Sequence, residues 1–95
     1  MRQLDEIRKD IDAIDQQITE LFEKRMELTA QVAEYKIANG KPVFDQKREE
    51  EKLTALAALT HSGENARGVR TLFETVMAIS RAQQQAMIDE RMLEV

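Results

Sequence analysis

The sequence predicts an all-helical fold: one domain over residues 1–95 whose three helices, the first very long, form an intertwined homodimer. Only 3 Gly and 1 Pro interrupt the 95 residues, so chain breakers are scarce among residues that favour helices. Apolar side chains recur in steps of three and four, which is the helical period. A chain of this length buries only roughly 60–65% of its unfolded surface, so association with a partner is expected.

The first helix is predicted over residues 4–38. Its apolar positions form two rows of a heptad pattern: Leu4, Ile11, Ile18 and Val32, and then Ile7, Ile14, Leu21, Leu28 and Tyr35. Gly40 suits the left-handed residue that ends a helix, and Pro42 cannot continue one. A helix of about 35 residues is about 52 Å long, whereas a compact globule of this size is roughly 30–35 Å across. A second copy of the chain is the expected cover for the overhanging apolar stripe.

Two shorter patterns predict helices over residues 46–60 and 65–92. Asp45 suits the N-cap of the second helix, and His61-Ser62-Gly63 is typical of its end. The apolar residues that define these helices are Leu53, Leu56 and Leu59 in the second, and Val69, Leu72, Phe73, Val76, Met77, Met87 and Ile88 in the third. No interdomain linker or internal repeat is visible between them, so a single domain is expected.

Composition excludes several classes of function. The net charge of −4 argues against a nucleic-acid-binding domain, which needs a basic face. The sequence has no cysteine and one histidine, His61, so thiol catalysis, disulfides and a His- or Cys-based metal site have no support. No stretch is apolar enough for a membrane span, and the first ten residues mix both charge signs without an apolar core. A cytoplasmic location is therefore expected.

Cations interrupt or flank the apolar rows of the first helix. Arg25 occupies a row position where Leu or Ile would fit, so its guanidinium needs an anion there. The alternative is a polar residue that fixes the helix register, or one whose side chain reaches the edge of the stripe. Arg8 and Lys36 flank the same rows 28 residues apart, which is about 42 Å along a straight helix. They could serve one small ligand only if Arg8 came from a second chain. The alternative is that both are solvated charges beside a coiled-coil seam.

Polar side chains also interrupt the other two helices. Ser80 and Gln84 fall on the apolar face of the third helix, and Asp45, Arg48 and Glu49 occupy the start of the second. Taken singly, mutual hydrogen bonding and helix capping would explain them. Convergence with the cations of the first helix on one pocket explains them together. Such a pocket would bind a small, multiply charged anion, and a dicarboxylate suits it.

Three segments of the sequence, IRKDIDAID, LFEKRMEL and AEYKIANGKPVFDQKREEE, resemble the all-helical (AroQ-type) chorismate mutases in order and spacing. The most diagnostic residues are Arg8 with the Ile11, Ile14 and Asp15 pattern, Arg25, Lys36, Pro42-Val43 and Asp45-x-x-Arg48-Glu49. The similarity extends over nearly the whole chain and is looser in the third helix. It implies an isomerase that converts chorismate to prephenate in phenylalanine and tyrosine biosynthesis, by a pericyclic rearrangement that uses no cofactor, metal or covalent intermediate. It also implies a homodimer with shared active sites.

The resemblance assigns roles to individual residues. Arg25, together with Arg8 of the partner subunit, falls on the arginines that bind the substrate carboxylates. Lys36 and Gln84 fall where the family places donors to the ether oxygen, and Lys36 also neighbours a carboxylate.

Four further positions complete the site that the resemblance implies. Glu49 and the backbone near Asp45 fall where the family holds the ring hydroxyl of the substrate. Arg48 and Ser80 fall at positions that complete the wall of the substrate site. Isochorismate-pyruvate lyases share this fold and a similar pocket, but the intact Asp45-x-x-Arg48-Glu49 segment favours the mutase. The remaining alternative is a non-catalytic regulatory or scaffolding helical dimer.

Overall fold

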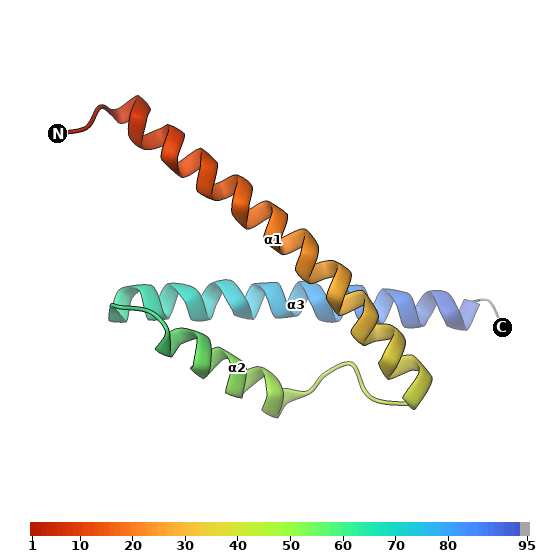
Figure 1. The fold of residues 1–95 in the computed structure, drawn as a ribbon. Coiled ribbons are helices and arrows are strands. Elements are labelled where there is room, and N and C mark those ends of the chain that lie inside the picture. Colours follow the sequence, from red (N-terminus) through yellow and green to blue (C-terminus); the bar gives the residue numbers. More distant parts are fainter. Residues whose placement is uncertain (94–95) are drawn as a thin grey trace.

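The computed structural model describes residues 1–93, which form three α-helices (Figure 1). Helix α1 runs from Leu4 to Asn39, α2 from Gln46 to Ala58 and α3 from Gly63 to Leu93. No strand occurs within residues 1–93. The predicted all-helical, three-helix chain with a very long first helix is therefore confirmed. Residues 94 and 95 of the predicted domain lie outside the described residues.

The connection between α1 and α2 follows from its glycine and its aspartate. Gly40 has φ 63° and ψ 28°, and the N–H of Lys41 bonds to the carbonyl of Lys36 at 2.9 Å, so α1 ends in a left-handed cap. The helix includes Asn39, one residue more than expected. The carboxylate of Asp45 accepts a hydrogen bond from the backbone N–H of Arg48 at 3.0 Å, which caps α2 where the sequence predicted it.

The turn between α2 and α3 lies two residues earlier than predicted at both ends. The N–H groups of Leu59 and Thr60 bond to carbonyls only three residues back, so the last turn tightens and α2 stops at Ala58. The hydroxyl of Ser62 accepts a hydrogen bond from the N–H of Asn65 at 3.1 Å. Ser62 is therefore the N-cap of α3, and not only part of the end of α2.

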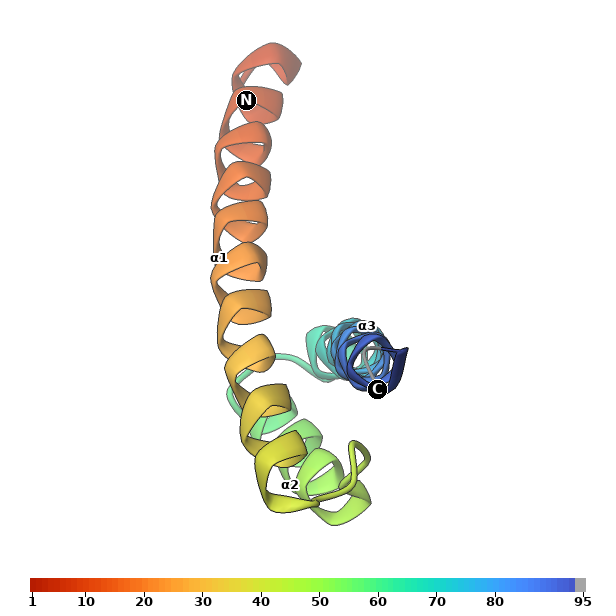
Figure 2. The same cartoon turned by 90° about the vertical axis from the view of Figure 1, so that its right-hand side faces the viewer.

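Helix α3 is the element against which the other two pack. After the tight turn α3 runs back beside α2, whereas the C-terminal half of α1 crosses α3 (Figures 1 and 2). Side-chain bonds at Gln83 and Arg91, together with one from Arg25 to Ser80, fix this crossing. Thr29 donates to the side-chain oxygen of Gln83 at 2.7 Å, while the amide of Gln83 donates to the carbonyl of Met26 at 2.9 Å. Arg91 pairs with Glu34 at 2.6 Å.

The N-terminal half of α1 projects away from α2 and α3 (Figure 1). The chain measures 62 × 26 × 14 Å and has a radius of gyration of 17.2 Å. A compact chain of this length would have a radius of gyration of about 12 Å. Among residues 1–93, no helix is both long enough and apolar enough to cross a membrane.

The single chain has a very small apolar core. Within the described part of the chain, the buried hydrophobic residues are Ala33, Leu53 and Met77, and two more buried residues, Ser80 and Gln84, are polar. By contrast, all nine apolar residues of the two heptad rows are exposed, with Leu21 at 62% and Ile14 at 54%. The apolar stripe predicted along α1 is therefore open to solvent in this chain.

Candidate active site

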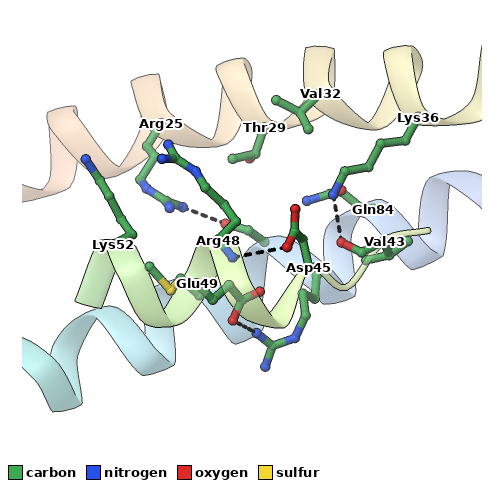
Figure 3. A pocket seen from close by; sticks show the side chains of 13 residues that line it. Arg25, Thr29, Val32, Lys36, Val43, Asp45, Arg48, Glu49, Lys52 and Gln84 are labelled. Carbon is green, nitrogen blue, oxygen red and sulfur yellow. Dashed lines mark hydrogen bonds and ion pairs between the residues drawn. The ribbon is translucent and has the colours of Figure 1, made fainter. Parts of the chain in front are cut away.

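A cavity of about 180 Å³ lies where the three helices approach one another (Figure 3). One wall comes from the C-terminal half of α1, one from the start of α2 with the segment before it, and one from the middle of α3. The lining residues are Arg25, Thr29, Val32, Lys36, Val43, Asp45, Arg48, Glu49, Lys52, Met77, Ser80, Arg81 and Gln84.

The α1 wall supplies two cations, and each is held by one hydrogen bond. Nη1 of Arg25 donates to the hydroxyl of Ser80 at 2.7 Å, and Nζ of Lys36 donates to the carbonyl of Val43 at 2.7 Å. A guanidinium has five N–H donors and an ammonium has three. Both groups are thus fixed in place and keep donors for a ligand.

The α3 wall supplies two neutral polar groups, Ser80 and Gln84, which are 4% and 5% exposed. The hydroxyl of Ser80 donates to the carbonyl of Val76 at 3.0 Å while it accepts from Arg25, so its hydrogen atom is committed. Oε1 of Gln84 is buried and has no hydrogen-bond partner within residues 1–93. Because buried amides are normally paired, the cavity wall has unused hydrogen-bonding capacity at Gln84.

The α2 wall is the most highly charged. Arg48 and Lys52 are exposed and extend from α2 toward α1 (Figure 3). The carboxylate of Asp45 is occupied by its capping bond to the N–H of Arg48. The carboxylate of Glu49 forms an ion pair with Arg81 of α3. Both acidic groups are therefore already engaged with donors of this chain.

The cavity is positively charged although the chain as a whole carries −4. Five lining residues are cations, namely Arg25, Lys36, Arg48, Lys52 and Arg81, whereas two are anions, Asp45 and Glu49. Within residues 1–93, no three histidine or acidic side chains come together in an arrangement that could hold a metal ion. The donor set instead suits a small anion with more than one carboxylate.

The structure brings together seven of the eight residues that the sequence analysis selected, which are Arg25, Lys36, Asp45, Arg48, Glu49, Ser80 and Gln84. The eighth, Arg8, lies in the projecting half of α1 and does not line this cavity. Two cations that the sequence analysis did not select, Lys52 and Arg81, also line it.

A weak signal for these two cations exists in the sequence. Lys52 follows Arg48 by one helical turn, and Arg81 is adjacent to Ser80. On a helix of unknown orientation, such charges look like any solvated charge, so the signal is not decisive.

Comparison with known proteins adds an independent observation. The family model described as chorismate mutase type II matches residues 7–85. That range contains all eight of the residues selected from the sequence. The chain is also 39% identical over 49 residues to the T-protein of Haemophilus influenzae. This match covers 52% of the chain and 13% of the relative, so the chain corresponds to a small part of that protein.

Proposed function

Because the chain belongs to the chorismate mutase type II family, we propose that it is an isomerase that rearranges chorismate to prephenate, a step of phenylalanine and tyrosine biosynthesis. The observation that carries this proposal is the cavity itself, in which cations from three helices and the amide of Gln84 surround a space of about 180 Å³. A pericyclic rearrangement needs a substrate held in one conformation and donors aimed at one oxygen. It does not need a nucleophile, and the hydroxyl of Ser80 has no base beside it to make it one.

Substrate binding is proposed to rest on paired carboxylates and arginines. Arg25 keeps free N–H donors after its bond to Ser80, and these can bind one carboxylate in two-pronged geometry. Arg8 of the partner subunit is proposed to bind the other carboxylate. Free chorismate mostly keeps its enolpyruvyl arm away from the ring. Two fixed arginines would select the chair-like conformer in which the bond-forming carbons meet.

Rate acceleration is proposed to come from Lys36 and Gln84. The C–O bond breaks ahead of C–C bond formation, so negative charge grows on the ether oxygen in the transition state. A donor fixed in a cavity without bulk water stabilises that charge more than it stabilises the ground state, by about 3–4 kcal/mol for a key donor. The bond from Lys36 to the carbonyl of Val43 supports this role, since it fixes the ammonium before substrate arrives.

The ring hydroxyl of the substrate is proposed to meet the α2 wall. The carboxylate of Glu49 can accept from it, and the backbone near Asp45 lies at the start of the same helix. Arg48 and Ser80 are proposed to complete the wall, Arg48 as a flexible cation at the mouth and Ser80 as the group that holds Arg25.

We further propose that the working form is an intertwined homodimer with two shared sites. The apolar stripe along α1 is exposed in the single chain, and a second copy would cover it. Arg8 lies about 28 residues, or about 42 Å of helix, from Lys36, so it can complete a site only in another chain. The cytoplasmic location expected from the sequence stays a prediction.

The test is to follow the disappearance of chorismate by ultraviolet absorbance with purified protein and no added metal or cofactor. Saturable turnover is expected, with prephenate identified by its conversion to phenylpyruvate in acid. A parallel assay offers isochorismate and measures pyruvate release. Pyruvate release without chorismate turnover would favour the lyase. A folded dimer that neither binds nor converts either compound would favour a non-catalytic role.

A further inference from the structure

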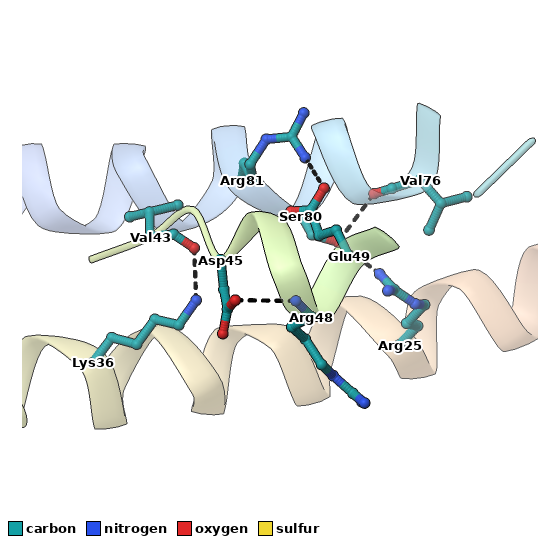
Figure 4. Close-up of polar contacts among 9 residues, drawn as sticks. All are labelled: Arg25, Lys36, Val43, Asp45, Arg48, Glu49, Val76, Ser80 and Arg81. Atoms are coloured by element: carbon teal, nitrogen blue, oxygen red, sulfur yellow. Dashed lines mark hydrogen bonds and ion pairs between the residues drawn. The ribbon is translucent and has the colours of Figure 1, made fainter. Parts of the chain in front are cut away.

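Arg81 stands between the cavity and a second hollow beside α2. It lines both spaces, and the second is also lined by Phe44, Glu50 and Leu53. The guanidinium pairs with the carboxylate of Glu49 through Nη1 and Oε1 (Figure 4). Its central carbon lies 5.0 Å from the centre of the Phe44 ring. Arg81 therefore contacts the carboxylate of Glu49, which is proposed to bind the substrate.

The ion pair between Arg81 and Glu49 is the least exposed of the ion pairs within residues 1–93. The side chains of Arg81 and Glu49 are 33% and 21% exposed, whereas both members of every other pair are at least 38% exposed. Partial burial reduces screening by water and salt, and the Phe44 ring covers one face of the guanidinium. These contacts hold Arg81 and Glu49 in one arrangement.

This arrangement has two consequences for the cavity. Arg81 occupies Oε1 of Glu49, while Oε2 has no hydrogen-bond partner among the described residues. One acceptor oxygen is thus left for a hydroxyl group of a ligand. The positive charge of Arg81 also offsets a negative charge that would otherwise face a dianionic substrate across the cavity.

We propose that Arg81 is a positioning residue for Glu49: it keeps that carboxylate turned into the cavity with one oxygen free, and it cancels the repulsion between that carboxylate and the carboxylates of the substrate. The inference rests on the proposed chorismate mutase activity and extends it to a residue that acts through its ion pair with Glu49.

A double-mutant cycle tests the inference. KM and kcat for chorismate are measured for the unmodified protein, Arg81→Met, Glu49→Gln and the double variant, with thermal unfolding recorded for each. Arg70→Met is the matched control. Arg70 lies three turns earlier on α3 and joins Glu50 of α2 in an ion pair of 2.7 Å, but it does not line the cavity.

Arg81→Met is expected to raise KM about tenfold, with a smaller fall in kcat, because an uncompensated carboxylate repels the bound dianion. In the Glu49→Gln background, the same substitution should change KM by less than about twofold, since no charge remains to be cancelled. Arg81→Lys should restore most of the lost affinity, because it keeps the charge. Arg70→Met should leave both constants within about twofold, as expected of an exposed pair.

Equal effects of Arg81→Met in both backgrounds would overturn the inference, because Arg81 would then act independently of Glu49. Equal damage by Arg70→Met would also overturn it, since the pair would then be only a tie between helices. If Arg81→Met does not fold, Arg81→Gln carries the same cycle. The proposed function fails separately, through absence of turnover by the unmodified protein. If the unmodified protein turns over chorismate normally and Arg81→Met has the same KM and kcat, this inference alone is overturned.

Discussion

Gln84 is a neutral amide in a cavity whose other proposed ether-oxygen donor, Lys36, is charged. An amide N–H can donate at any pH, whereas a carboxyl group at the same place can donate only when it is protonated. Gln84 is 5% exposed, so a substitution there changes the cavity wall and not the outer surface. The choice of glutamine at this position has a direct consequence for the pH dependence of turnover.

We predict that kcat of the unmodified protein changes little between about pH 6 and pH 8, and that Gln84→Glu gains activity as the pH falls, because only its protonated form donates. Gln84→Ala should lower kcat by about 100- to 1,000-fold at any pH. The measurement is kcat against pH for the three proteins. Gln85→Glu is the control, because Gln85 is exposed one residue further along α3 and bonds to Asp89. A pH-independent Gln84→Glu would contradict the assigned role.

At the scale of the elements, Gly40 decides where α1 ends. It has φ 63°, and a Cβ atom added there would meet nothing within 4 Å, so the cost of a side chain is conformational and not steric. Gly68, within α3, also has open space around its Cβ position but has no positive φ. The same substitution at the two glycines therefore isolates the effect of backbone conformation.

Gly40→Ala is predicted to lower the free energy of unfolding by about 1 kcal/mol, because alanine is strained in the left-handed region. Gly68→Ala should raise the free energy of unfolding by about 0.5–1 kcal/mol, because alanine favours the helix interior. Chemical denaturation at one fixed protein concentration measures both. If both substitutions changed the free energy of unfolding in the same direction, the left-handed conformation of Gly40 would not account for the effect of alanine there.

The elements were largely predictable from the sequence because each helix has its own apolar period and because Gly40, Pro42 and Asp45 give a clear boundary. The turn between α2 and α3 lies two residues earlier than the sequence predicted. The reason is that a serine followed by glycine is as typical of a helix end as of an N-cap, and here Ser62 is the N-cap of α3.

The site could be predicted where polar groups interrupt an apolar row, as at Arg25 and at Ser80 and Gln84. The pairing of Arg81 with Glu49 could not, because it depends on how α2 crosses α3. The packing of the two helices sets that geometry, and the apolar period of either helix alone does not predict it.

At the scale of the whole molecule, the proposed dimer turns two incomplete chains into two complete sites. Arg25 lines the cavity of its own chain, and Arg8 lies in the projecting half of α1. If each site takes Arg8 from the partner subunit, a defect at Arg8 and a defect at Arg25 in the two chains of one dimer fall in the same site. The other site is then intact.

We predict that Arg8→Ala and Arg25→Ala are each nearly inactive as pure proteins, and that mixing them under subunit exchange restores activity. Random exchange makes half of the dimers mixed, each with one intact site, so about one quarter of the normal activity should return. Turnover before and after exchange is the measurement, and subunit mixing is checked with differently tagged chains. Proven mixing without recovery would reject the shared site.

The order in which α1 and its packing partners occur in the chain affects how the protein is made. The side-chain bonds that tie α1 to α3 join residues 54 to 57 positions apart. A ribosome that adds about 5–20 residues per second completes α1 several seconds before α3 exists. The apolar stripe of α1 is open to solvent even in the complete chain, so from that moment only chaperones, or the nascent chains of neighbouring ribosomes, can cover it. Assembly of the protein should therefore respond to the spacing of ribosomes on its messenger RNA.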